Sequence, residues 1–160
     1  MSSTQASTQS STEASSVGIV DMNLEVVTLP VSDVDRAKRF YQSLGWRLDI
    51  DLVVSDEILL IQMTPPRSQC SLHFGKGMTA MEPGSLERLY LTVKDIDAAR
   101  DDLISRGIDV SEVDEQPKPP GFPDFPGRSY FAYASFSDPD GNGWLLQEVT
   151  TRLPGRVWED

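Results

Sequence analysis

The sequence predicts an α+β fold in which two βαβββ modules form a curved, open-barrel cleft. One observation is an internal repeat: Leu24–Gly45 aligns without a gap on Leu86–Gly107, and nine of these 22 positions are identical. A second is that each copy starts with alternating apolar residues, typical of a strand, and continues with apolar residues at helical spacing. A third is the copy number, because two copies indicate a duplicated supersecondary unit, whereas a solenoid needs three or more.

The first module is predicted over residues 22–76. It starts with a strand over Glu25–Val31 and continues with a helix that is capped by Ser32 or Asp33 and ends at Gly45. Short polar side chains accept hydrogen bonds from the first N–H groups of a helix, and glycine adopts the backbone conformation that ends many helices. Three further strands are then expected, over Trp46–Leu52, Glu57–Met63 and Cys70–Phe74.

The second module, residues 86–150, repeats this order. A strand over Arg88–Val93 leads to a cap at Asp95 and a helix over Ile96–Ser105, which stops at Gly107. Its three remaining strands are expected over Ile108–Val113, Ser129–Phe136 and Gly143–Val149. A proline-rich insertion over Asp114–Arg128 separates two of them and is predicted to be an irregular loop.

The two modules are expected to make one domain, residues 22–153, between two tails. Residues 1–21 are rich in Ser, Thr and Gln and have little to bury, so we expect a disordered tail, and residues 154–160 form a second tail. The net charge of −11 argues against nucleic acids and anionic membranes as partners. Cys70 is the only cysteine, which excludes an intramolecular disulfide, and no secretory signal is evident. We therefore expect a cytoplasmic protein.

Three segments resemble a known family. These are V-S-D-V-D-R-A-K-R-F-Y-Q-S-L-G-W at 31–46, V-K-D-I-D-A-A at 93–99 and D-P-D-G-N-G-W-L-L-Q-E at 138–148. They are similar to the vicinal oxygen chelate superfamily, which includes glyoxalase I, extradiol dioxygenases, fosfomycin-modifying enzymes and bleomycin-binding resistance proteins. The resemblance covers residues 22–153 and implies the glyoxalase/bleomycin resistance/dioxygenase fold. This fold hosts several chemistries and also plain binding proteins.

The resemblance also implies where a site lies. In the family, the first and last strands of each module present side chains to a shared cleft, often to a divalent metal held by His, Glu or Gln. Matched motif by motif, the corresponding residues here are Val26, His73, Arg88 and Gln147. His73 and Gln147 also correspond in the internal repeat, because Thr64–Gly75 aligns on Asp138–Val149.

Strand alternation adds further residues to this cleft. The alternate apolar residues of each first strand pack under the helix, so their neighbours, which include Thr28 and Tyr90, face the cleft. Tyr90 and Trp144 are candidates for an aromatic lining, although Trp144 suits the hydrophobic core equally well. The predicted ligand-binding set is therefore Val26, Thr28, His73, Arg88, Tyr90, Trp144 and Gln147.

This set departs from a metal-binding pattern. Val26 has no donor atom, and Arg88 remains cationic with no lone pair to offer, so we expect no metal cofactor. One alternative stays open: a shift of one residue in the last strand would turn Glu148 into the cleft. Together with His73, it would then be a ligand of a Zn, Ni, Mn or Fe ion.

The expected function is to bind a small organic molecule without a metal. Arg88 would be the counter-charge for an anionic or enolisable group on that ligand. The first alternative is an enzyme, a glyoxalase-type lyase or isomerase or a dioxygenase-like protein, that uses a divalent metal or uses His73 as catalytic acid or base. A second alternative is an interaction module with a vestigial cleft. The sequence leaves open whether the two modules of a cleft come from one chain or from a homodimer.

Overall fold

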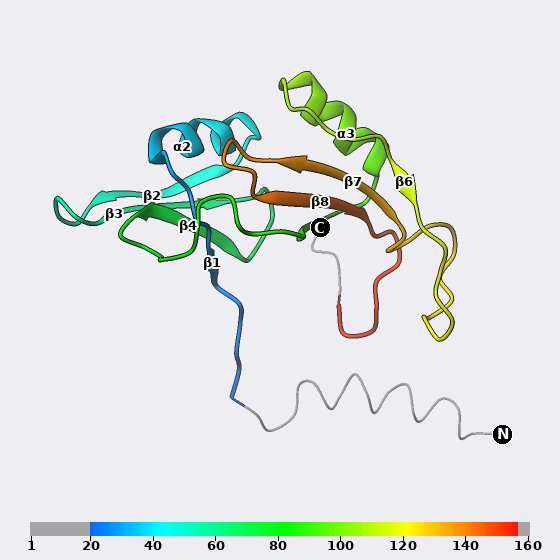
Figure 1. The fold of residues 1–160 in the computed structure, drawn as a ribbon. Helices are drawn as coiled ribbons and strands as arrows, with labels where there is room; N and C mark the ends of the chain where they lie inside the picture. Colours follow the sequence, from blue (N-terminus) through cyan, green and yellow to red (C-terminus); the bar gives the residue numbers. More distant parts are fainter. Residues whose placement is uncertain (1–19, 157–160) are drawn as a thin grey trace.

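The computed structural model describes residues 20–156, so almost all of the expected N-terminal tail and the last four residues lie outside the described residues. Two βαβββ modules are present, which confirms the predicted α+β fold (Figure 1). The first module consists of β1 (Val26–Thr28), α2 (Val34–Ser43), β2 (Arg47–Val53), β3 (Leu59–Thr64) and β4 (Ser71–Lys76). The second consists of β5 (Leu89–Val93), α3 (Ile96–Ser105), β6 (Asp114–Glu115), β7 (Ala132–Ser137) and β8 (Gly143–Glu148).

Each module forms its own four-stranded sheet. The strand orders are β1-β4-β3-β2 and β5-β8-β7-β6, so the duplicated sequence has a duplicated topology. In both sheets the first strand runs parallel to the last, which places Thr28 opposite His73 and Thr92 opposite Gln147. All other described pairings are antiparallel. Within residues 20–156 no strand pair joins the two sheets, and they do not close into a barrel.

The strand predicted over Ile108–Val113 is wrong. This segment runs beside β7 without a regular ladder, because the Ser111 hydroxyl takes the place of a backbone acceptor for the Ser135 N–H at 2.8 Å. Regular pairing starts later, where Asp114 and Glu115 meet Tyr133 and Ala132. The short strand β6 therefore lies at the start of the segment that was expected to be a loop.

The helix boundaries agree with the predicted caps. The Asp33 carboxylate accepts from the Arg36 N–H at 3.0 Å, and the Asp95 carboxylate accepts from the Ala98 N–H at 3.1 Å. Gly45 and Gly107 follow the two helices with φ of 85° and 86°, a left-handed conformation that favours glycine. Among residues 20–156, no helix is both long and apolar enough to span a bilayer.

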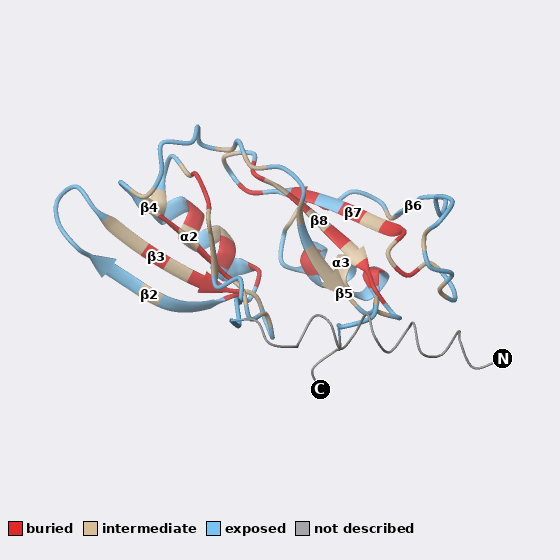
Figure 2. Cartoon of the chain, turned by 90° about the horizontal axis from the view of Figure 1, so that it is seen from below, coloured by how far each residue is buried: buried red, intermediate tan, exposed pale blue. Residues whose placement is uncertain are grey.

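Each sheet has one face covered by a helix and one open face. The alternation is clear in Figure 2, where buried and less buried residues succeed one another along β7 and β8. On the covered faces, Leu72 and Phe74 of β4 and Trp144 and Leu146 of β8 are buried. These side chains belong to one hydrophobic core that extends through both modules. The second sheet and the first therefore share a core although they share no strand pair.

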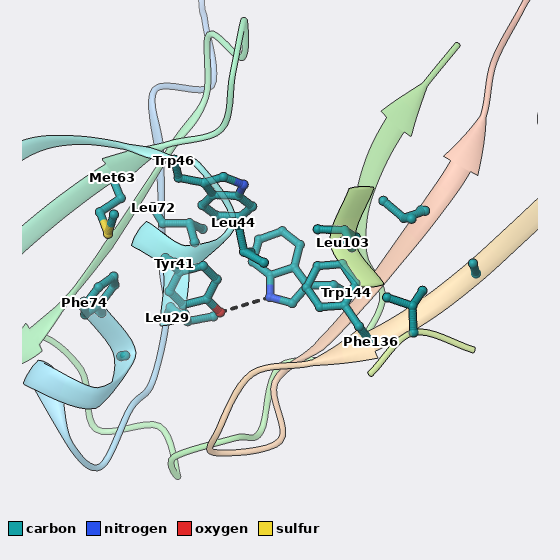
Figure 3. Packing of buried hydrophobic residues seen from close by; sticks show 14 of the residues in the cluster. Leu29, Tyr41, Leu44, Trp46, Met63, Leu72, Phe74, Leu103, Phe136 and Trp144 are labelled. Carbon is teal, nitrogen blue, oxygen red and sulfur yellow. Dashed lines mark hydrogen bonds between the residues drawn. The ribbon is translucent and has the colours of Figure 1, made fainter. Parts of the chain in front are cut away.

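A buried polar network crosses between the modules at the centre of this core. We call the side chains of Tyr41, Asp138, Asn142 and Trp144 the inter-module network. The Tyr41 hydroxyl donates to the Asp138 carboxylate at 2.9 Å. It accepts from the Trp144 indole N–H at 3.0 Å, the bond drawn as a dashed line in Figure 3. The Asn142 amide donates to Asp138 at 2.8 Å and to the Pro30 carbonyl at 2.9 Å. Burial, and next the nearby Asp138 carboxylate, raise the pKa of Tyr41 strongly.

Residues outside the inter-module network also contact the turn that carries Asp138 and Asn142. The Asp140 carboxylate accepts from the Ser32 N–H at 3.1 Å and from the Arg36 guanidinium at 3.2 Å. Gly84, in the segment between the modules, lies against the same turn. A Cβ atom on Gly84 would lie 2.0 Å from the Asp140 carbonyl oxygen, and its φ is +79°. The turn thus contacts the start of the first module and the connection to the second.

Replacing Tyr41 with Phe tests the inter-module network. The change leaves two buried polar groups without their partner, so we expect the free energy of unfolding to fall by about 1–3 kcal/mol. Tyr90→Phe is the matched control, because its hydroxyl is also hydrogen-bonded but the residue is 46% exposed. The control is expected to change stability by less than about 0.5 kcal/mol. Urea unfolding measures both, and equal losses would contradict this interpretation.

The raised pKa of Tyr41 predicts a specific loss of stability in alkali. Tyrosines of the unfolded chain ionise near pH 10, whereas folded Tyr41 stays protonated. Its stabilising contribution is therefore complete below about pH 10 and declines above it by about 1.4 kcal/mol per pH unit. Unfolding free energies measured from about pH 9 to pH 11 should show the advantage of the wild type over Tyr41→Phe shrinking. A difference that stays constant over this range would refute the assignment.

Candidate functional site

The open face of the first sheet carries three of the predicted site residues. Val26 and Thr28 of β1 and His73 of β4 alternate with residues that pack under α2, and all three are half-buried. The His73 Nε2 lies 2.6 Å from the Gln62 Oε1 on the neighbouring strand β3. Because an amide oxygen can only accept, Nε2 is the donor, and Nδ1 is left as the basic nitrogen of the neutral ring.

The open face of the second sheet carries Tyr90 and Gln147, with Arg88 directly before β5. The Gln147 amide donates to the Tyr130 carbonyl at 3.1 Å and to the Tyr133 hydroxyl at 3.2 Å. The Arg88 guanidinium donates to the Tyr90 hydroxyl at 2.7 Å and lies 5.8 Å from the centre of that ring. Arg88 is exposed and has a φ of 59°. His73 and Gln147 thus occupy equivalent places on two separate sheets.

Trp144 lies on the other side of its sheet from Gln147. It is only 4% exposed and belongs to the inter-module network and the core. Its ring stacks on Phe136 with 6.3 Å between centroids and meets Trp46 edge-on at 5.2 Å. The structure therefore places Trp144 in the core on the helix-covered face of its sheet, and not on the open face with Gln147.

Glu148 also faces the helix-covered side. Its carboxylate accepts from the Ile96 N–H at the start of α3 at 3.0 Å and from the Arg128 guanidinium at 2.9 Å. Arg128 in turn pairs with Asp97 at 2.8 Å and with Glu115 at 2.9 Å. The hydrogen bonds that Arg128 donates to these carboxylates, to Glu148 foremost, raise the pKa of Arg128. The alternative register, in which Glu148 would turn into the cleft, is not present.

The donor atoms do not fit a divalent metal. His73 is on the open face of the first sheet, and Glu148 is on the covered face of the second, so the alternative ligand pair is not brought together. Across the described residues 20–156, no three His, Cys, Asp or Glu side chains are grouped so that they could hold a metal ion. Of the residues that the resemblance assigns to the metal positions, namely Val26, His73, Arg88 and Gln147, only His73 is a good ligand, and a metal needs three or four.

A cavity of about 780 Å³ lies between the two modules, at the free edge of β5. The first module contributes the end of α2, where Leu44 and Trp46 lie, and the β3–β4 turn, residues 65–69. The second contributes β5, one side of α3 and the segment after β8. Within the described chain, Tyr90 is the one member of the predicted ligand-binding set that lines this cavity.

The cavity combines apolar walls with positive charge. Its apolar lining includes Leu44, Trp46, Leu91, Leu103, Phe136 and Leu146. Four cationic residues also line it, Arg67, Lys94, Arg152 and Arg156, against one acidic residue, Asp102. The Arg152 guanidinium donates to the Thr92 hydroxyl at 3.2 Å. A protein with a net charge of −11 therefore concentrates positive charge at this cavity.

Sequence reasoning missed this group because it followed strand faces. Arg67 lies in a turn, and Arg152 and Arg156 lie beyond the last strand, so no periodicity connects them. One feature of the sequence could have identified Arg67. It follows two prolines in the segment Thr64–Ser68, and this segment aligns on the turn Asp138–Asn142. A basic residue at the tip of one turn, where the other copy has Gly141, marks a difference between the two modules.

Comparisons with known proteins agree with this architecture. The model of the glyoxalase/bleomycin resistance protein/dioxygenase superfamily matches residues 23–146. The crystal structure of TnmS3, an antibiotic binding protein from Streptomyces sp. CB03234, is 32% identical, with a TM-score of 0.63 over 82% of this chain and 99% of that one. A glyoxalase/bleomycin resistance protein from the same organism is 31% identical, with a TM-score of 0.60 over 77% and 97% of the two chains.

A third solved structure is a superfamily member from Sphaerobacter thermophilus DSM 20745. It is 25% identical, with a TM-score of 0.63, and the match covers 81% of this chain and 99% of that chain. Among curated proteins, no sequence matches the chain.

Proposed function

The chain belongs to the glyoxalase/bleomycin resistance protein/dioxygenase superfamily, and on this premise we propose that it binds a small organic molecule between its two modules without a metal ion. The proposed ligand has an apolar body and an anionic or enolisable head group. The protein would hold this molecule and leave its covalent structure unchanged.

The observation that carries the proposal is the inter-module cavity. Its volume of about 780 Å³ lies within the range of roughly 300–1,000 Å³ that is typical of sites for small organic molecules. Aromatic and aliphatic side chains such as Trp46 and Phe136 would cover the apolar body of a ligand. Guanidinium groups match carboxylates and related anions with paired hydrogen bonds, which favours an anionic head.

The similarity to TnmS3 supports a binding role. That protein is an antibiotic binding protein, and the two sequences are 32% identical over most of both chains. A protein that only binds a molecule needs a shaped cavity and orienting polar groups, and it needs no acid, base or metal beside the ligand. The cavity described above has apolar walls and cationic side chains that could orient such a molecule.

The enzyme alternative depends on His73, which has the side chain best suited to proton transfer near neutral pH. His73 does not belong to the lining of the cavity, and its Nε2 is engaged by Gln62 at 2.6 Å. A general base must lie within hydrogen-bond reach of the proton that it removes. A ligand inside the cavity would therefore have no imidazole beside it. The carboxylate in the lining, Asp102, pairs with Arg106 at 3.0 Å, and we favour binding over catalysis.

The proposed ligand class can be tested with a matched pair of probes, 2-naphthoic acid and its uncharged counterpart 2-naphthamide. Both have the same apolar body, and the acid alone carries an anionic head. We expect millimolar 2-naphthoic acid to raise the melting temperature of the protein and the amide to raise it much less, since a ligand of the native state stabilises according to its affinity. Equal shifts would remove the anionic preference, and no shift with either probe would contradict the proposal.

Arg88→Ala tests whether the open face of the second sheet contributes to ligand binding. If the head group reaches Arg88, removal of this guanidinium should weaken binding of 2-naphthoic acid by about 1.5–3 kcal/mol, the usual value of a charged hydrogen bond. Isothermal titration calorimetry measures the change, and Arg39→Ala, at an exposed position of α2, controls for the loss of one positive charge. A loss restricted to Arg88→Ala would locate the head group at the open face of the second sheet.

The absence of suitable donors predicts that the purified protein is metal-free. Protein that has never been exposed to a chelator should contain well under one equivalent of zinc, iron, nickel or manganese by elemental analysis. Treatment with EDTA should leave its melting temperature unchanged, because residues 20–156 contain no ligand set that could hold a stabilising metal. A stoichiometric metal bound through His73 would overturn this expectation.

A further inference from the structure

The internal repeat explains why the cavity exists. In the second module, the β7–β8 turn packs against the first module, and its Asp138 and Asn142 form the inter-module network with Tyr41. By the same repeat, the β3–β4 turn of the first module should pack against the β5–α3 junction of the second. Residues 65–69 of that turn do face this junction, but the cavity lies between them.

At the equivalent positions of the second contact, three of the four side chains are smaller than those of the inter-module network. Leu103 stands at the position of Tyr41, Thr64 at that of Asp138, Ser68 at that of Asn142 and Cys70 at that of Trp144. Thr64 bonds within its own sheet, with 2.7 Å between its hydroxyl oxygen and that of Ser71. No bond equivalent to Tyr41–Asp138 therefore crosses here. The cavity therefore lies at the place that is equivalent, by the internal repeat, to the inter-module network.

The backbone of the β3–β4 turn singles out Arg67. The Ser68 N–H bonds the Pro65 carbonyl at 3.0 Å, which makes Pro66 the second residue of a four-residue turn and Arg67 the third. Arg67 has a φ of 62°, and a positive φ at this place is normally adopted by glycine or asparagine. In the other copy the equivalent residue is Gly141, with a φ of 99°. An arginine here has an unfavourable backbone conformation, which is a common mark of a functional side chain.

Arg67 is among the arginines that have no carboxylate partner within the described residues, in contrast to four others. Arg36, Arg47, Arg106 and Arg128 all pair with carboxylates. Within residues 20–156, Arg67 forms no ion pair, although it lines a cavity in an acidic protein. Its guanidinium is therefore available to a carboxylate that enters from solvent.

We propose that Arg67 is the specificity-determining residue of the cavity and binds the anionic head of the ligand. This inference rests on the proposed function and adds to it the position of the head group, at the β3–β4 turn. The apolar body then extends toward Leu103, into the volume that Tyr41 fills in the equivalent contact. Arg67 contributes to affinity and selectivity, and it has no role in chemistry.

The first test changes the charge of this side chain. Arg67→Gln should weaken binding of 2-naphthoic acid at least tenfold, which corresponds to the low end of the value of a charged hydrogen bond, and should leave binding of 2-naphthamide within about twofold. Arg39→Gln removes the same charge from an exposed position of α2 and should change neither affinity. Arg67→Gly should weaken the acid equally while the melting temperature stays the same or rises, since glycine suits the backbone at this position.

The second test fills the cavity with a larger side chain. Leu103→Tyr places the ring of the equivalent residue in this volume and should weaken both probes at least tenfold. Because a larger side chain can disturb packing, its melting temperature is measured alongside, and the Arg67 variants give an independent answer. If the wild type binds the acid and Arg67→Gln binds it equally well, the assignment of Arg67 falls and the proposed function stands. If the wild type binds neither probe, both fall.

Discussion

The hydroxyl group of Tyr41 is the contact on which the relative placement of the two modules depends. It donates to the buried carboxylate of Asp138 and accepts from Trp144, so each partner depends on the other two. Left without partners in a dry interior, any of these groups would be destabilising. The two sheets have no strand pair in common within residues 20–156, and the shared core and this network therefore determine how they lie. The edges of the cavity follow from that placement.

The two copies have diverged in complementary ways. One turn, Asp138–Asn142, carries short polar side chains that bond across the modules and contribute to stability. The other, residues 65–69, has prolines and an arginine and borders a cavity with positive charge. A duplicated unit can divide its roles in this way, because one contact is sufficient to hold two packed modules together. The second contact is then free to differ.

Local sequence features predicted most of the fold, and long-range contacts determined the site. Caps at Asp33 and Asp95 and the alternation along β8 depend on near neighbours, so they could be read from the sequence. The segment Ile108–Val113 was misread because the Ser111 side chain replaces a backbone partner. The alternation of side chains along each strand separated the two faces of each sheet. It could not show that the cavity opens at the edge of β5. That position depends on how two modules pack, which no local pattern encodes.

Arg128 has a consequence for how this chain tolerates change. Its guanidinium bonds carboxylates from three elements, namely Asp97 of α3, Glu115 of β6 and Glu148 of β8. The proline-rich segment 116–127 therefore begins and ends at bonded residues, and the Gln116 N–H also meets the Phe131 carbonyl at 2.7 Å. Lengthening a loop with anchored ends costs entropy that grows only slowly with its length. Insertions within residues 116–127 that leave Phe122 packed on Phe131, at 4.8 Å between ring centroids, should therefore leave the walls of the cavity in place.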